Sequence, residues 1–386
     1  MIAGPFGVLV IQSGLLLFGL HAIFKQTFAP RCAAWVTFGV FVFPPVMTPM
    51  AVIWKDCSMA GLLACAIALL LSDRRRLKLL GLLAVVGATA MRYNAFGATL
   101  PLVVLLFEWR PGMHWLPRYA IAIATWFGVT VAAFGVNAAL TDKPMHYWHS
   151  SLALYDIVGT LAYVDDDLPD AQLREELAGT QLRIDTGIHQ NIRAVYSPRE
   201  FFPIINHPKY MMWDMPINGY EPAPQAQRDA IGRAFWNTIT AHPWAYTKHR
   251  FTVLAAVLDL QTHRAGGAVV KRDPRNLGFS HEYGLSTGFS PLQLKLTKWL
   301  GFLARHTPIF TPWVYAVIAI LLLPFALRYR DVLAILLSGL VMESSLLFLA
   351  HSVDYRYSHW MVISTIIGAV ILIARRSRRT GRAPPE

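Results

Sequence analysis

The sequence predicts an all-α polytopic membrane protein with one large insert outside the membrane. The 386 residues are 55% hydrophobic and only 15% charged, whereas a soluble domain is about 45–50% apolar and about 25% charged. The apolar residues gather in blocks about as long as a bilayer span. Among the short connections between these blocks, most Lys and Arg residues lie in every second one. The net charge of +12 therefore indicates cytoplasmic loops rather than nucleic-acid binding, for which the sequence has no reader motif.

About nine transmembrane helices are expected, six of them within residues 1–140 and three within 309–374. Two of the apolar stretches are short for a span and flank Arg92-Tyr93-Asn94. We expect two helices that meet at this tripeptide near one membrane surface, and one long kinked helix is the alternative. The stretches fall at about 5–24, 33–53, 57–72, 78–91, 95–108, 119–140, 310–327, 332–350 and 360–374.

The basic residues predict an orientation, because short cytoplasmic loops retain Lys and Arg. The opposite short loops hold only Lys55, Arg92 and Arg356. The N-terminus is therefore expected outside, and the basic tail at 375–386 in the cytoplasm. The basic residues on the predicted cytoplasmic side are Lys25, Arg31, Arg74, Arg75, Arg76, Lys78, Arg110, Arg118, Arg328, Arg330, Arg375, Arg376, Arg378 and Arg379.

The long polar region at 141–308 is expected to form a mostly helical insert outside the membrane. Helix-forming composition covers Asp170–Arg183, and residues 226–261 indicate one or two helices interrupted at His242-Pro243, because proline ends a helix. Residues 292–305 combine leucines and Trp299 with Lys295, Lys298 and Arg305. They predict an amphipathic helix that lies in the membrane interface.

Polar side chains gather on the outer face, at the ends of the predicted spans. Charged groups at span ends need partners or water, and a group of them often marks a site. Cations suit a phosphate, since guanidinium binds its oxygens bidentately and an ammonium acts as a point charge. A solvated loop end, a snorkelling arginine or a local ion pair is the alternative for each residue. The candidate lipid-phosphate ligands are Lys55, Arg92 and Arg356, supported by Tyr93, Asn94, Asp354 and Tyr357.

Transfer of a sugar from such a phosphate needs a carboxylate that accepts the acceptor's proton, and positive charge or a metal at the departing phosphate. Asp56, beside Lys55, is the first catalytic candidate, and Asp156 in HSSLALYDIVGT is the second. A structural hydrogen-bonding role is the alternative for both. The run at 165–167 offers oxygen ligands for a divalent cation, although a solvated acidic turn is the simpler interpretation, and no metal-ligand set stands out.

Four stretches carry a resemblance to a known family. They are PPVMTPMAVIWKDCSMAGLLACAIALLL (44–71), GLLAVVGATAMRYNAFGATLPLVVLL (81–106), HPWAYTKHR (242–250) and DYRYSHW (354–360). Their order resembles the GT-C superfamily of polyprenyl-phosphate-sugar-dependent glycosyltransferases, in its bacterial mannosyltransferase-like and lipid-A-aminoarabinose-transferase-like branch. Arg92 and Pro101 match that branch, as does Asp354-Tyr355-Arg356-Tyr357.

The resemblance implies a multi-pass protein of the bacterial inner membrane whose insert lies on the periplasmic or extracellular side. Its partner would be a polyprenyl-phosphate-linked sugar, transferred to a glycan, lipid or protein acceptor. The family's catalytic carboxylate lies in a first outer loop, and the resemblance implies that this sequence begins after that loop. One expectation is therefore that the first span is missing and that the chain lacks its own catalytic base.

Two other functions stay open from the sequence. The first is a transporter or flippase of lipid-linked glycans, and the second is a non-catalytic membrane protein of the same fold. A transporter is expected to show inverted repeats and charges at mid-membrane. No repeat is visible in the sequence, and Glu343 is the one charged residue at depth in a predicted span. A neutral Glu343, or one that is hydrogen-bonded to a neighbouring helix, is the favoured interpretation.

Overall fold

The computed structural model describes residues 4–110, 112–142, 146, 148–182, 187–206, 224–260 and 290–379. Within these ranges the protein is helical, and none of the described residues forms a β-strand. The chain divides into two compact units. The bundle unit comprises residues 1–137, 263–345 and 354–386, and the insert unit comprises 138–262 and 346–353. The last residues of the predicted basic tail, 380–386, lie outside the described residues.

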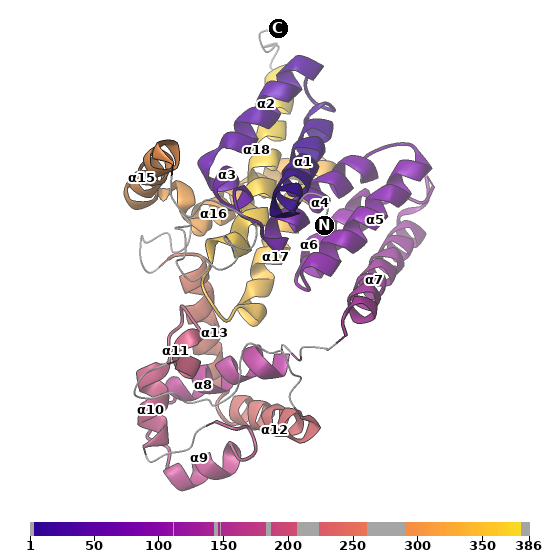
Figure 1. The fold of residues 1–386 in the computed structure, drawn as a ribbon. Helices are drawn as coiled ribbons and strands as arrows, with labels where there is room; N and C mark the ends of the chain where they lie inside the picture. The colour runs from indigo at the N-terminus through magenta and orange to yellow at the C-terminus, as the bar shows by residue number, and fades with distance from the viewer. Residues whose placement is uncertain are drawn as a thin grey trace. The chain divides into compact units, whose positions relative to one another are not determined.

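The helices of the bundle unit follow the predicted apolar stretches, and the stretch at 33–53 is divided between α2 and α3 (Figure 1). Helix α17 ends in the segment that belongs to the insert unit. Short 3-10 turns precede α16 and α18. The helices are α1 (Gly4–Phe24), α2 (Pro30–Val42), α3 (Pro44–Met50), α4 (Lys55–Leu70), α5 (Arg75–Met91), α6 (Ala95–Leu106), α7 (Trp115–Leu140), α15 (Pro291–His306), α16 (Pro312–Ala326), α17 (Arg330–Leu349) and α18 (His359–Arg379).

Local sequence explains several helix boundaries. Proline occupies the first helical position of α2, α3, α15 and α16, where its missing N–H costs no hydrogen bond. Helix α15 also begins with a capping box, in which Ser290 and Gln293 each bond the other's backbone N–H. Helices α5 and α6 are separate and enclose residues 92–94, as the polar tripeptide predicted.

Four described helices are long and apolar enough to cross a bilayer, namely α1, α7, α17 and α18, the last counted from Tyr355. Helices α2 and α3, bent by 70°, count as a fifth span if the pair crosses as one. Such helices are characteristic of a membrane protein. The remaining apolar helices are shorter than a single span requires, so the expected total of about nine spans stays a prediction.

Glycines allow close packing of α1 on α4. A Cβ added to Gly19 would lie 2.6 Å from the carbonyl carbon of Ala64, and one added to Gly61 would lie 2.8 Å from the Cβ of Leu15. Small residues let helices approach closely, which gives membrane helices much of their packing energy. The α1–α4 contact is therefore fixed by residues that carry no side chain.

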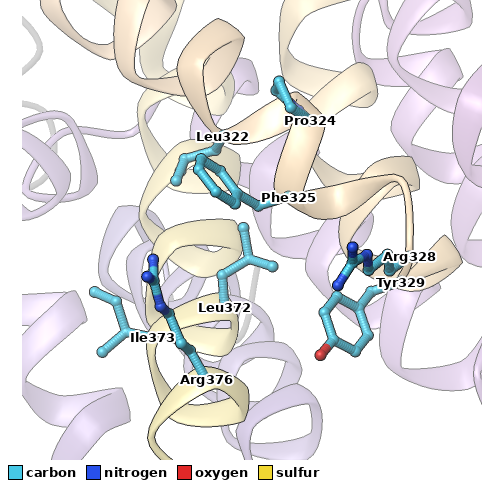
Figure 2. A pocket seen from close by; sticks show the side chains of 8 residues that line it. All are labelled: Leu322, Pro324, Phe325, Arg328, Tyr329, Leu372, Ile373 and Arg376. Carbon is cyan, nitrogen blue, oxygen red and sulfur yellow. The ribbon is translucent and has the colours of Figure 1, made fainter. Parts of the chain in front are cut away.

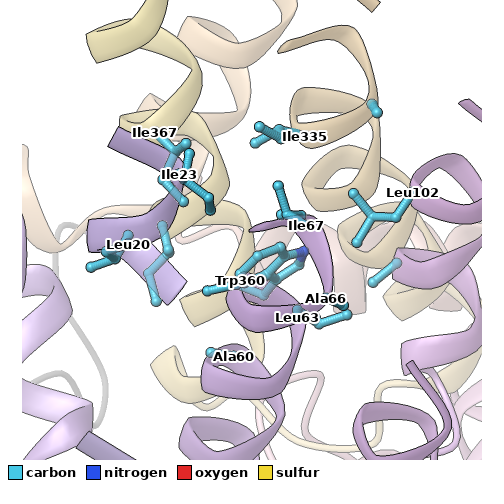
Figure 3. Close-up of a cluster of buried hydrophobic side chains, with 14 of the residues drawn as sticks. Leu20, Ile23, Ala60, Leu63, Ala66, Ile67, Leu102, Ile335, Trp360 and Ile367 are labelled. Carbon is cyan, nitrogen blue, oxygen red and sulfur yellow. The ribbon is translucent and has the colours of Figure 1, made fainter. Parts of the chain in front are cut away.

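The core of the bundle unit surrounds α4 and the start of α18. Trp360 of α18 is fully buried, and its indole N–H donates to Ser338 Oγ at 2.9 Å, while Ser338 donates to the carbonyl of Ala98 at 2.7 Å. This chain of hydrogen bonds joins α18, α17 and α6 inside an apolar cluster (Figure 3). Labelled members of the cluster include Leu20, Ile23, Leu63, Ile67, Leu102, Ile335 and Ile367.

The insert unit is built around one short buried helix. Residues 154–161 of α8 are all buried, and α10, α12 and α13 pack against this helix. Helices α12 and α13 are interrupted at His242, as His242-Pro243 predicted. The helices of this unit are α8 (Leu154–Ala162), which follows a π-helical turn at Trp148–Ala153, α9 (Asp170–Glu176), α10 (Ile188–Val195), α11 (Phe202–Asn206), α12 (Gln225–Ala241) and α13 (Pro243–Val257).

Candidate functional site

The candidate site is a cluster of charged residues in the bundle unit, where α4 begins, α5 ends and the turn before α18 lies. We call it the Asp56 cluster; its members are Lys55, Asp56, Arg92, Asp354 and Arg356. Arg92 Nη1 donates to Asp56 Oδ1, and Arg356 Nε lies 4.0 Å from Asp56 Oδ2. Three segments that are distant in the sequence therefore meet at one carboxylate.

Asp354 holds the turn that carries Arg356. Its Oδ1 accepts the backbone N–H of Arg356 at 3.1 Å, which caps the 3-10 turn, and its Oδ2 lies 2.8 Å from Arg356 Nε. The Asp-x-Arg spacing thus folds back on itself and orients the guanidinium. Burial raises the pKa of the Asp354 carboxyl above its usual value, while the charge of Arg356 and the accepted backbone N–H act in the opposite direction.

Aromatic rings orient the two guanidinium groups. The Cζ of Arg92 lies 4.6 Å from the ring centroid of Tyr357. The Cζ of Arg356 lies 4.9 Å from the Trp54 ring and 5.5 Å from the Tyr357 ring. These separations lie within the range of cation–π attraction. Lys55 has a ring partner of its own, because its Nζ lies 5.9 Å from the centroid of Tyr93.

The Asp56 cluster has three cations and two carboxylates, so one positive charge is in excess. The side chain of Asp56 is 1% exposed, that of Arg92 14% and that of Arg356 31%. The Asp56 carboxylate therefore lies deepest in the cluster, and the two guanidiniums lie between it and the surface. This arrangement suits an anionic ligand that approaches from outside.

These contacts indicate a different role for each of the predicted site residues. Asp56 lies in the cluster, but its buried carboxylate faces Arg92. This contact suits a residue that positions the Arg92 guanidinium. Asn94 is buried at the N-cap of α6. Its Nδ2 has no hydrogen-bond partner among the described residues. Tyr93 and Tyr357 serve as the rings described above.

Asp156, the second catalytic candidate, lies in the insert unit and belongs to a different set of contacts. It is buried in α8, where His249 Nε2 lies 3.1 Å from Asp156 Oδ1 and Arg250 forms an ion pair with the same oxygen. His249 Nδ1 bonds the hydroxyl of Tyr196 at 2.8 Å. Arg250 Nη1 also donates to the carbonyl of Ala350 at 2.7 Å. We call these residues the Asp156 network, and their burial suits a structural role.

One glycine makes room for this network. A Cβ added to Gly159 would lie 2.2 Å from the His249 ring. Gly159 follows Asp156 by three residues, so both face the same side of α8. Burial lowers the pKa of His249, while Asp156 acts in the opposite direction. The sequence alone did not predict this pairing, because it joins residues of α8 and α13 that lie 93 positions apart.

The described residues show no group of three or more His, Cys, Asp or Glu side chains that could hold a metal ion. In the acidic run at 165–167, Asp167 pairs with Arg193 at 2.8 Å. Glu343, which lies in α17, accepts a hydrogen bond from Ser358 Oγ at 2.7 Å. This contact agrees with the expectation of a neutral or hydrogen-bonded carboxyl at that position.

Comparison with known proteins adds no relative to this description. No protein-family model matches the sequence, and the comparisons with curated proteins and with solved structures found no match either.

Proposed function

We propose that the chain is a membrane glycosyltransferase that takes a sugar from a polyprenyl-phosphate donor and passes it to a glycan, lipid or protein acceptor outside the membrane. The observation that carries this proposal is the convergence of Arg92 and Arg356 on the buried carboxylate of Asp56. The similarity of the surrounding sequence to the GT-C superfamily supports it.

The cluster has the chemistry that a lipid phosphate needs. Two guanidiniums, each oriented by an aromatic ring and a carboxylate, offer planar pairs of N–H donors to phosphate oxygens. The ammonium of the exposed Lys55 adds a point charge. Preorganised donors of this kind stabilise the negative charge that grows on a leaving phosphate.

The transfer itself needs few groups. The acceptor's hydroxyl oxygen forms a bond to the anomeric carbon of the sugar, and the bond between that carbon and the phosphate oxygen breaks. The phosphate leaves with the electron pair and stays bound to the cations. The acceptor's proton goes to a carboxylate, and Asp354 suits this role better than Asp56, because its side chain is 24% exposed against 1%.

A binding experiment tests the phosphate site without knowledge of the sugar. The purified full chain is titrated with a short-chain polyprenyl phosphate and, separately, with the matching polyprenol, which lacks the phosphate. We expect Arg92→Ala and Arg356→Ala to weaken phosphate binding by about tenfold to about a hundredfold, since a charge-assisted hydrogen bond contributes about 1.5–3 kcal/mol. The polyprenol should bind weakly to every form.

Arg110→Ala is the matched control, because it removes one exposed arginine at the predicted cytoplasmic end. Sugar transfer from a labelled polyprenyl-phosphate sugar to acceptors in isolated membranes should follow the same order of variants. Equal binding of polyprenol and polyprenyl phosphate, or full transfer by the Arg92→Ala chain, would contradict the proposal.

A further inference from the structure

The turn that carries Arg356 is anchored on both sides of that residue. Tyr355, which precedes Arg356, is 4% exposed, and its hydroxyl donates to the carbonyl of Pro45 at 3.3 Å. On the other side, Nε2 of the fully buried His359 lies 3.2 Å from the carbonyl oxygen of Val46. A carbonyl oxygen only accepts hydrogen bonds, so this Nε2 carries a proton. Both anchors are therefore backbone carbonyls of the same short helix, α3.

A proline in α3 explains why one of these carbonyls needs a donor from outside the helix. In an α-helix the carbonyl of residue 45 would accept the N–H of residue 49. Pro49 lies inside α3 and has no N–H. The hydroxyl of Tyr355 donates in its place. Pro45 is buried, and a buried carbonyl without a donor is costly. The missing N–H thus ties α3 to the turn that carries Arg356.

The other end of α3 is tied to the start of α4, which carries Asp56. The thiol of Cys57, the next residue, donates to the carbonyl of Pro49 at 3.1 Å. Gln12 of α1 holds the same end, because its Nε2 donates to the carbonyl of Met50 at 3.1 Å. One short helix is therefore bonded both to the turn with Arg356 and to the first turn of α4.

The distances within the Asp56 cluster depend on these two attachments. Arg356 Nε lies 4.0 Å from Asp56 Oδ2, and Arg356 Cζ lies 4.9 Å from the ring centroid of Trp54. Trp54 is the N-cap residue of α4, and Asp56 lies in its first turn. Both distances persist only while the turn and α4 keep fixed positions. Donors fixed in advance bind a ligand without the cost of ordering them.

On the basis of the phosphate site proposed above, we propose that α3 positions Arg356 against Asp56 and that Tyr355 is a positioning residue for phosphate binding. The Tyr355 hydroxyl acts through the turn and through Arg356. It fixes the orientation in which the guanidinium offers its N–H donors to the phosphate.

The variant Tyr355→Phe tests this role, because it removes the hydroxyl and leaves the ring, whose centroid lies 5.8 Å from that of Phe310. The purified full chain is titrated with the short-chain polyprenyl phosphate. We expect about fivefold weaker binding, the effect of about one net hydrogen bond. In the Arg356→Ala chain the same substitution should change the affinity by less than about twofold, since the effects of coupled residues are not additive.

Tyr315→Phe is the matched control. Tyr315 belongs to the same apolar cluster as Tyr355 and is 6% exposed, and its hydroxyl donates to the carbonyl of Ile309 at 2.7 Å. That carbonyl lies in the 3-10 turn before α16 and not in α3. The control therefore loses the same kind of hydrogen bond, and it should bind the polyprenyl phosphate as the unmodified chain does.

The double variant Y355F/P49A separates positioning from stability. Alanine at position 49 supplies the N–H that the carbonyl of Pro45 lacks, so the thermal unfolding midpoint in detergent should recover from any loss in Tyr355→Phe. The turn stays detached from α3, so the affinity for the polyprenyl phosphate should stay about fivefold low. This variant also carries the test if Tyr355→Phe alone fails to fold.

The outcomes distinguish this role from the phosphate site itself. Undiminished binding by Arg356→Ala would contradict the phosphate site, and the role of Tyr355 with it. If Arg356→Ala binds weakly, three results overturn the role of Tyr355 alone. They are full binding by Tyr355→Phe, equal weakening by Tyr355→Phe with and without Arg356, and affinity that recovers together with the midpoint in Y355F/P49A.

Discussion

At the scale of single residues, Asp354 links structure to the proposed reaction. Its carboxyl pairs with Arg356 and caps the turn that carries it, yet it keeps more exposure than the carboxyl of Asp56. Burial raises its pKa, which brings a carboxyl closer to the range useful for a general base. The same group can therefore position a phosphate ligand and accept a proton.

This assignment predicts a pH dependence of sugar transfer. A base must be ionised, so the rate is expected to fall on acidification, and at a higher pH than an ordinary aspartate with a pKa of about 3.9 would give. The measurement is the initial transfer rate across pH in isolated membranes. Asp354→Asn should reduce transfer by about 10²-fold or more while the donor's phosphate still binds; an Asn variant that transfers normally would leave Asp354 with a capping role alone.

Gly159 gives the clearest residue-scale prediction for stability. In Gly159→Ala the new methyl group meets the His249 ring, and His249 cannot retreat without loosening its bonds to Asp156 and Tyr196. Overpacking of a well-filled core costs about 1–3 kcal/mol. We expect a lower thermal unfolding midpoint, measured on the purified chain.

Gly232→Ala is its matched control. Gly232 lies inside α12 of the same unit, and an added Cβ meets nothing within 4 Å. Alanine is the better helix former by about 0.8–1 kcal/mol, so this variant should keep or raise the midpoint. A similar loss in both variants would show that backbone freedom, and not the histidine contact, makes Gly159 necessary.

At the scale of elements, the sequence predicted those features that depend on neighbouring residues. Apolar blocks located the bundle helices, and the breaks at 92–94 and at His242-Pro243 followed from a polar tripeptide and a proline. The Asp156 network joins groups 93 residues apart. Helical periodicity predicts on which face of its helix a residue lies, but not which other helix packs against that face. No local pattern could therefore reveal this pairing.

The arginines that follow α16 and those in the last turns of α18 show the same limit. In the sequence Arg328 and Arg376 were indicators of orientation, equal to their neighbours Arg330 and Arg375. The structure gives Arg330 a contact with Glu108 and Arg375 an ion pair with Asp331, and it places Arg328 and Arg376 along the wall of a cavity (Figure 2). The Asp56 cluster was more predictable, since all its members lie at connections expected on one side of the membrane.

The packing of α1 on α4 supplies the prediction at this scale. Gly19→Ala places a methyl group 2.6 Å from backbone atoms of α4, which no rotamer change can relieve. The helices must separate, and the expected cost is about 1–3 kcal/mol. Gly14→Ala on α1 meets nothing within 4 Å and is the control. Unfolding in detergent, followed by near-ultraviolet circular dichroism, should separate the two variants; equal midpoints would mean that α1 packs loosely.

At the scale of the whole bundle unit, Arg356 and Arg376 lie near opposite ends of α18. Twenty residues separate Arg356 from Arg376. At about 1.5 Å per residue they span about 30 Å along the helix, the thickness of the hydrocarbon core. The Asp56 cluster and the C-terminal end of α18 therefore suit opposite membrane surfaces, and the distribution of basic residues predicts which surface is which.

Helix α4 allows the sharpest test of this arrangement. With 16 residues it is shorter than the helices that qualify as spans by length and composition, so its crossing is a real question. Ile53 and Asp73 are exposed positions on either side of it. Each can be changed to cysteine in a chain whose Cys32, Cys57 and Cys65 have been replaced, and then treated with a membrane-impermeant maleimide on intact cells.

We expect label at position 53 and none at position 73 until the membrane is permeabilised. Lys55, Asp56 and their partners would then face the outside, where a lipid-linked sugar could meet its acceptor. Label at position 73 alone would show that the bundle has the opposite orientation. The Asp56 cluster would then face the cytoplasm, which would contradict the proposal of transfer outside the membrane. Label at both positions would mean that α4 does not cross the membrane, because a helix of 16 residues between two outer loops can only enter and leave by the same surface. The expected count of about nine spans would then be too high.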